Sequence, residues 1–185
     1  MYVDAGVKIE PKIALLMCSA IISDTLIFRS PTCTEMDREA GKALAEIAGI
    51  NIKEHAHEMF FAGSNISEKT AKELFTGDFK RFSIGDTTFG IGQVSCMDGE
   101  ELDQVKKKVM TYMKEQYKSL GVNMLYFMLT DIIKPGTELL CVGDGAMELV
   151  ERAFGVQGSD DVVYLPGVVS RKKQVVPEIM MEITQ

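Results

Sequence analysis

Residues 122–129, VNMLYFML, form a nearly unbroken apolar run. A strand that is covered on both faces of a sheet has such a run, because neither set of its alternating side chains meets water. Residues 79–84 and 87–94 predict two further strands around a Gly85-Asp86 turn, which is a good hairpin signal. Because a hairpin forms an antiparallel pair, the sheet around the central run should be mixed rather than purely parallel.

Helical patterns separate the predicted strands in the C-terminal two thirds of the chain. We expect a helix after Ser67, a long helix capped by Asp98 and Glu101, and a final helix at residues 175–183. The other expected elements are strands at 139–142 and 162–165 and a helix at 145–154. This alternation predicts an α/β fold in which helices flank both sides of a mixed β-sheet.

The N-terminal third has a helical pattern, and its first helix begins at Pro11, a residue that the first turn of a helix tolerates. The residues behind it are apolar on both faces: Ile13, Leu16, Met17 and Ile21 on one, and Leu15, Cys18 and Ile22 on the other. Such a helix is predicted to be buried on all sides. We therefore expect it to belong to a larger body, most of which lies outside this sequence.

The pattern also places a domain boundary in the chain. Two more helices are predicted in the N-terminal part, at residues 34–48 and 54–61. Gly63-Ser64-Asn65, small and polar between two periodic segments, is the best candidate for a linker. The predicted domains are therefore a helical segment at residues 1–62 and an α/β domain at residues 63–185.

Composition limits the class of protein. A net charge of −7 with 46% hydrophobic residues is typical of a globular protein with a core, and it argues against a nucleic-acid binder with a dominant basic face. Four scattered cysteines without a C-x-x-C pair indicate reduced thiols and a cytoplasmic protein. The apolar run at residues 13–22 lacks the positive start of a signal peptide, and Asp24 interrupts it too early for a membrane span. We expect no export or membrane segment.

Asp24 follows the apolar stripe of the first helix at helical spacing. A carboxylate in this place should be poorly solvated, and it lies at a helix C-terminus, where the dipole disfavours negative charge. A nearby cation would resolve both conflicts. The alternative is a turn in which Ser23, Asp24 and Thr25 satisfy backbone donors. A single acidic residue cannot make a metal site, because Mn²⁺ and Mg²⁺ need several ligands.

Residues 170–174, SRKKQ, hold three consecutive basic residues in this acidic chain and precede the expected last helix. Cations before a helix N-terminus are unfavourable unless an anion lies there too, and phosphate would fit. A solvated charge run on a loop explains the same pattern equally well. Lys80, at the start of a predicted strand, can be an ordinary edge charge.

Two other features are interpreted as structural. His55 and His57 are two positions apart on a predicted helix and point away from each other, which argues against a pair of metal ligands. The Gly143-Asp144-Gly145 stretch lacks a P-loop lysine and the spacing of a dinucleotide loop, so it is interpreted as the start of a helix.

Three stretches, SAIISDTLIFRSPT at residues 19–32, GDFKRF at residues 77–82 and GVVSRKKQVVP at residues 167–177, together resemble one family, the manganese-dependent family II inorganic pyrophosphatases of the DHH superfamily. SAIISDTLIFRSPT at residues 19–32 resembles the signature that closes their metal-binding domain. GVVSRKKQVVP at residues 167–177 resembles the signature of their C-terminal domain, and GDFKRF at residues 77–82 matches the position of a substrate-binding lysine. The resemblance covers essentially the whole chain in order and corresponds to the C-terminal portion of such an enzyme.

The resemblance implies an enzyme that hydrolyses pyrophosphate to two phosphates with a metal-activated hydroxide. It implies that Asp24 is a metal ligand and that Lys80, Arg171 and Lys172 are the catalytic cations that bind phosphate oxygens. The implied cofactor is Mn²⁺, with Co²⁺ or Mg²⁺ as substitutes. The D-H-H-type motifs that supply most metal ligands are absent from this sequence. We therefore expect this portion alone to be inactive and not to bind metal tightly.

The partners implied are pyrophosphate and phosphate, with neither nucleic acid nor a membrane, and a homodimer is one option for the full-length protein. Two alternatives stay open. An exopolyphosphatase or another DHH phosphoesterase would share the C-terminal module, although the full SRKKQVVP run favours a pyrophosphatase. A stand-alone phosphate-binding or regulatory module would have no need of the missing metal ligands.

Overall fold

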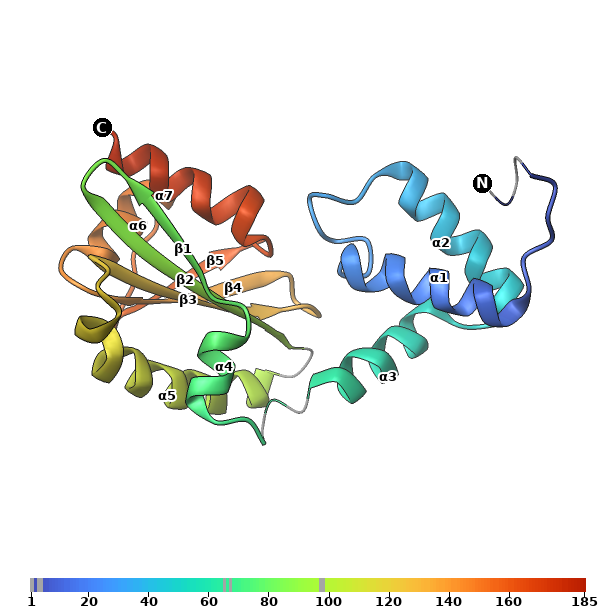
Figure 1. Cartoon of the computed structure of the whole chain (residues 1–185), viewed down its shortest axis with the longest axis horizontal. Helices are drawn as coiled ribbons and strands as arrows, with labels where there is room; N and C mark the ends of the chain where they lie inside the picture. Colours follow the sequence, from blue (N-terminus) through green and yellow to red (C-terminus); the bar gives the residue numbers. More distant parts are fainter. Residues whose placement is uncertain (1, 3–4, 65, 67, 97–98) are drawn as a thin grey trace. The chain divides into compact units, whose positions relative to one another are not determined.

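The computed structural model describes residues 2, 5–64, 66, 68–96 and 99–185. The chain divides into two compact units, Met1–Gly63 and Ser64–Gln185, and each is described by itself (Figure 1). Within the described residues no helix is long and apolar enough to cross a membrane.

The described residues of the first unit form three helices around a small core (Figure 1). The helices are α1 (Pro11–Asp24), α2 (Glu35–Ala48) and α3 (Ile52–Ser64). The start of α2 is fixed by a capping box, in which Thr34 and Asp37 bond to each other's backbone N–H groups. Its end is fixed by Gly49 in the left-handed conformation that glycine adopts without strain.

The prediction that α1 is buried on all sides is wrong. Its buried residues are Ala14, Cys18 and Ile22, which share one face and pack with residues of α2 and α3. On another face Leu16 is 66% exposed and Ile13 is 37% exposed. The physical reason is that two helices can cover only one side of a third. The apolar pattern shows which faces of a helix could be buried. In this unit, however, only one face of α1 is covered by other helices.

The second unit is a five-stranded sheet with helices on both faces (Figure 1). Its strands are β1 (Lys80–Ile84), β2 (Thr87–Cys96), β3 (Met124–Asp131), β4 (Gly136–Val142) and β5 (Val162–Pro166). Its helices are α4 (Ala71–Gly77), α5 (Gly99–Gln116), α6 (Ala146–Phe154) and α7 (Val176–Ile183), with a 3₁₀ turn η1 (Tyr117–Leu120) and a π-helical turn η2 (Arg171–Val175).

The strand order β1-β2-β3-β4-β5 follows the sequence. β2 and β3 are parallel and are connected through α5, whereas the other neighbouring pairs are antiparallel. The expected hairpin is present, with Ile84 and Thr87 paired on either side of the Gly85-Asp86 turn. The predicted mixed α/β fold is therefore confirmed.

Two cores lie on opposite faces of this sheet. α4 and α5 pack on one face and α6 and α7 on the other, as Figure 1 shows. β3 contributes alternate residues to both cores: Tyr126 and Met128 to the α6–α7 core, and Phe127 and Leu129 to the α4–α5 core. This double coverage is why its sequence is a continuous apolar run.

Several element boundaries differ from the predicted ones. α4 begins at Ala71 instead of just after Ser67, because Thr70 and Glu73 form a capping box there. α3 is longer at both ends and takes in Gly63 and Ser64, the first two residues of the expected linker. The predicted cap of α5 involves Asp98, which lies outside the described residues, while the Glu101 carboxylate accepts a hydrogen bond from Cys96 Sγ at 2.9 Å.

Candidate functional site

Arg171 is the most firmly held of the predicted site residues. It begins η2, the turn that leads into α7, and its side chain is only 11% exposed. Nη1 donates to the main-chain oxygens of Asp78 at 2.6 Å and of Ile91 at 3.2 Å, and Nη2 donates to the Asp78 carboxylate at 2.8 Å. These bonds fix the plane of the guanidinium group at the junction of α4, β1 and β2.

Lys80 lies at the same junction of α4, β1 and β2, which is called the corner of the sheet below. It is the first residue of β1 and pairs across the ladder with Ile91, whose carbonyl oxygen accepts a bond from Arg171. Phe82, two residues further along β1, packs into the α6–α7 core, and side chains two apart in a strand share a face. Lys80 therefore lies on the face of the sheet that η2 and α7 cover, the same face as Arg171.

The basic run forms a turn of π-helix instead of the open loop considered above. Lys172 and Lys173 follow Arg171 in η2, and both are exposed. Among the described residues, no hydrogen bond or ion pair engages the ammonium group of Lys80, Lys172 or Lys173. The structure thus brings Lys80 and Arg171 to one corner, with Lys172 beside Arg171, and leaves the lysine charges unneutralised by protein groups.

A side chain within the basic run holds the segment that precedes Arg171. Oε1 of Gln174 accepts hydrogen bonds from the backbone N–H groups of Val169 and Ser170, both at 3.0 Å. Its Nε2 donates to the carbonyl oxygen of Gly167 at 3.1 Å. The Ser170 hydroxyl in turn accepts from the N–H of Lys173 at 3.3 Å and caps the turn. The polar residues that flank the cations therefore fix the backbone that carries them.

The other side of the corner is positioned by close packing on β2. Gly90 faces the ring of Phe79, and a Cβ at Gly90 would lie 2.4 Å from that ring. The Phe79 ring also packs at a tilt against the ring of Phe75 of α4, with 4.9 Å between the ring centroids. The absent side chain at Gly90 lets the connection from α4 to β1 lie directly on β2, and this connection includes Asp78, the partner of Arg171.

Sequence reasoning did not find Asp78 or assign a role to Gln174. Asp78 lies within the quoted GDFKRF stretch, but nothing local in that stretch shows that its carboxylate contacts a residue 93 positions away. The role of Gln174 had a weak signal, because a glutamine inside a basic run has no charge of its own to contribute.

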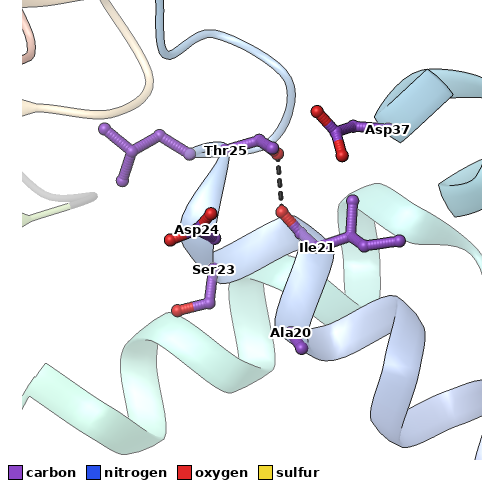
Figure 2. A pocket seen from close by; sticks show the side chains of 7 residues that line it. Ala20, Ile21, Ser23, Asp24, Thr25 and Asp37 are labelled. Atoms are coloured by element: carbon purple, nitrogen blue, oxygen red, sulfur yellow. Dashed lines mark hydrogen bonds between the residues drawn. The ribbon is translucent and has the colours of Figure 1, made fainter. Parts of the chain in front are cut away.

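Asp24 belongs to the first unit and ends α1. It lines an open pocket with Ala20, Ile21, Ser23, Thr25, Leu26 and Asp37. Figure 2 shows the carboxylates of Asp24 and Asp37 at this pocket and the Thr25 hydroxyl donating to the Ile21 carbonyl oxygen at 2.6 Å. The expectation of a poorly solvated carboxylate is wrong, because Asp24 is exposed: the stripe it continues faces outward in this unit.

The chain makes an unusual turn directly after Asp24. Leu26, Ile27 and Phe28 all have positive φ angles, of 48°, 55° and 63°. Non-glycine residues in this conformation each cost of order 1–2 kcal/mol, so the turn needs support from its surroundings. Thr25 Oγ1 accepts a hydrogen bond from the N–H of Phe28 at 3.1 Å. The Phe28 ring packs against Gly41, where an added Cβ would lie 2.7 Å from the ring.

The donor set of the described residues does not by itself fit a metal ion. No group of three histidine, cysteine, aspartate or glutamate side chains that could hold an ion occurs in the described part of the chain. Asp37, the other acidic residue of the pocket, accepts two hydrogen bonds from Thr34, and the backbone bond followed by the side-chain bond lowers the pKa of its carboxyl group. Asp24 offers a single exposed carboxylate.

The two histidines occupy different environments. His55 Nε2 bonds to the Ser19 hydroxyl at 2.7 Å and ties α3 to α1, whereas His57 is exposed. The four cysteines are free thiols, and burial raises the pKa of Cys18 and of Cys141. Such thiols are poor nucleophiles, because the thiolate is the reactive form.

Comparisons with known proteins identify the family of this chain. The model of the DHHA2 domain matches residues 57–181. The "Probable manganese-dependent inorganic pyrophosphatase" of Clostridium acetobutylicum is 45% identical over 183 residues, which are 99% of this chain and 59% of that protein. The "Cobalt-dependent inorganic pyrophosphatase" of Clostridium perfringens is 43% identical over 99% of this chain and 33% of its own length.

A solved structure gives the same result for the fold. A Methanococcus jannaschii protein assigned to the family II inorganic pyrophosphatases matches with a TM-score of 0.81 and 41% identity, over 96% of this chain and 58% of that one. The chain thus spans less than two thirds of the length of each of these relatives. The resemblance indicated by the three signature stretches is confirmed over nearly the whole chain.

Proposed function

Because the chain belongs to the DHHA2 domain family, we propose that it is the phosphate-binding portion of an inorganic pyrophosphatase. In this proposal residues 63–185 form the substrate-binding domain, and residues 1–62 are the helical tail of a DHH metal-binding domain. The relatives named above are manganese- or cobalt-dependent inorganic pyrophosphatases, which supports pyrophosphate as the substrate and hydrolysis as the reaction of the full-length protein.

One observation carries the proposal: Lys80 and Arg171 meet at Ile91, on one face of the sheet. Lys172 adds a second unneutralised ammonium group next to Arg171. Clustered cations repel one another, and a bound anion offsets this repulsion. A local group of cations in a chain of net charge −7 is therefore consistent with an anion-binding site. Pyrophosphate, with several oxygens around each phosphorus, can accept bonds from all three side chains at once.

The three cations have different tasks in this arrangement. Among the described residues no group accepts a bond from Nε of Arg171, so its Nε–Nη2 edge can bind two oxygens of one phosphate in a planar fork. Lys80 and Lys172 are point charges on flexible stems that offset the negative charge which builds up on a leaving phosphate. Asp24 supplies one carboxylate to a metal site whose other ligands are not among the described residues.

Isothermal titration of inorganic pyrophosphate into the chain tests the proposal. Lys80→Ala should weaken binding by about tenfold, the effect of removing one charged partner of a phosphate. Lys173→Ala is the matched control, because it removes an equal charge from the same turn and should leave affinity within about twofold. Equal weakening by both variants, or no binding by the unmodified chain, would refute a specific site.

A cytoplasmic location and a homodimer of the full-length protein stay predictions.

A further inference from the structure

Asp78 is an acidic residue in direct contact with a cation of the proposed anion site. Its carboxylate accepts from Nη2 of Arg171 at 2.8 Å, and its main-chain oxygen accepts from Nη1 at 2.6 Å. A carboxylate so close to a bound anion would repel it. Its presence therefore needs a physical reason, and two are available: it either competes with the anion for Arg171 or orients Arg171 for the anion.

The hydrogen-bond inventory of Arg171 favours orientation. A guanidinium group has five N–H donors in one plane. Both hydrogens of Nη1 go to main-chain oxygens, of Asp78 and Ile91, and one hydrogen of Nη2 goes to the Asp78 carboxylate. Main-chain oxygens of a strand and of a packed connection cannot leave when an anion arrives. Arg171 thus stays at this corner even if the Asp78 carboxylate moves away. Competition between the carboxylate and an anion would therefore free little of the Arg171 side chain.

The remaining donors lie on one edge of the guanidinium. Nε–H and the second Nη2 hydrogen share the edge away from Nη1, and among the described residues neither has an acceptor. Nη1 is held by the two main-chain oxygens. The bond from Nη2 to Asp78 Oδ1 then prevents the guanidinium plane from rotating about Nη1. This is the arrangement in which a bidentate edge is presented to a phosphate before the phosphate binds.

Asp78 is itself well placed for this task. It follows α4 directly, and the neighbouring Phe79 is seated on β2 by the missing side chain of Gly90. Its side chain is 52% exposed, so the carboxylate can be changed without opening a core. Lys80 and Lys172 keep the corner positive although Asp78 neutralises part of the Arg171 charge.

We propose that Asp78 is a positioning residue that presents the Nε–Nη2 edge of Arg171 to pyrophosphate. The inference rests on the proposed function and adds a residue to its site. Asp78→Ala removes the acceptor and the charge, whereas Asp78→Asn removes the charge and keeps an oxygen that can accept from Nη2. Asp86→Asn, an equal change of charge in the exposed β1–β2 turn, controls for the general effect of a less acidic protein.

Pyrophosphate titration and ¹⁵N relaxation of the Arg171 Nε–H group test the inference together. Asp78→Ala should weaken binding by about tenfold, as expected for loss of one charge-assisted hydrogen bond, and should lower the heteronuclear NOE of Arg171 Nε in the free protein. Asp78→Asn and Asp86→Asn should stay within about threefold of the unmodified chain and keep Arg171 rigid. If Asp78→Ala does not fold, Asp78→Ser, whose hydroxyl is too short to reach Nη2, takes its place.

Other outcomes would overturn the inference. Tighter binding by both Asp78→Ala and Asp78→Asn would show that Asp78 competes with the anion. Unchanged binding and an unchanged Arg171 NOE in Asp78→Ala would show that the carboxylate does not orient the group. Absence of binding by the unmodified chain would instead count against the proposed function, and the NOE of Arg171 would still decide whether Asp78 orders that side chain.

Discussion

Arg171 and Asp78 lie 93 residues apart in the sequence and form a salt bridge of 2.8 Å in the folded chain. The contact joins the turn before the last helix to the connection between α4 and β1. This connection leads directly into Lys80, the first residue of β1. The two stretches of sequence that carry the proposed phosphate-binding cations are therefore one corner of the second unit. Several consequences of this arrangement can be measured.

Replacing Arg171 by lysine should weaken pyrophosphate binding by more than about tenfold. A lysine keeps the positive charge, but it cannot donate to Asp78 and Ile91 while presenting a two-donor edge to a phosphate. Isothermal titration measures the effect. Arg81→Lys, a change at an exposed neighbour on β1, is the control and should leave the affinity unchanged. An Arg171→Lys variant that binds normally would show that a point charge is sufficient.

Gln174→Ala should lower the unfolding free energy of the second unit by roughly 1–3 kcal/mol, because three backbone groups lose their side-chain partner. Pyrophosphate affinity should fall with it, since the backbone before Arg171 is no longer held. Urea unfolding and titration measure the two effects. Gln104→Ala, at an exposed position of α5, should change neither. Loss of stability without loss of affinity would separate Gln174 from the site.

Gly90→Ala should be more damaging than a single added methyl group suggests. The new Cβ would lie 2.4 Å from the Phe79 ring, so the connection that carries Asp78 must move away from β2. We expect a destabilisation of about 1–3 kcal/mol, the usual cost of overpacking, together with a more mobile Arg171. Urea unfolding and Arg171 Nε relaxation are the measurements. A variant that is as stable as the unmodified chain would show that Phe79 does not need this space.

Gly41→Ala tests the support of the turn after Asp24. Alanine in a helix interior normally stabilises by about 1 kcal/mol relative to glycine. In α2, however, the added Cβ would meet the Phe28 ring at 2.7 Å and push against the left-handed turn. We expect faster hydrogen exchange in α1 and α2. Gly77→Ala, where a Cβ would meet nothing within 4 Å, is the control and should not destabilise the chain. Slower exchange in Gly41→Ala would contradict this account.

The chain alone should not hydrolyse pyrophosphate in the presence of manganese. A catalytic metal needs several protein ligands, and the described residues gather no group of three that could hold one. A phosphate-release assay with manganese in excess makes the measurement. Robust turnover that is abolished by Asp24→Asn would show that the metal site is complete within this chain, in conflict with its donor set.

The sequence predicted the fold class better than it predicted the surroundings of individual residues. The apolar run at residues 122–129 identified β3, because burial on both faces leaves a pattern in the strand itself. The burial of α1 could not be predicted in the same way, since apolar faces do not show which of them finds a partner in this unit. Leu26 to Phe28 carry no local signal for positive φ, because that turn is held by Thr25 and by the space at Gly41.

The contact between Arg171 and Asp78 was beyond prediction for a different reason. It depends on how η2 meets the start of β1, and the sheet order β1-β2-β3-β4-β5 that brings about this meeting is a property of the whole second unit. The resemblance of the GDFKRF and SRKKQ stretches to known signatures predicted that both take part in one site. It did not indicate that an aspartate of the first holds an arginine of the second.

The most direct test of the central claim is an NMR titration of the ¹⁵N-labelled chain with inorganic pyrophosphate. The account predicts that the amide signals that shift with pyrophosphate concentration belong to residues 78–80 and 170–172, together with Nε of Arg171. These residues form one corner at the Arg171–Asp78 contact. Shifts confined to another region, such as the Gly143–Gly145 loop, or to one of the two segments alone, would contradict a shared pyrophosphate site.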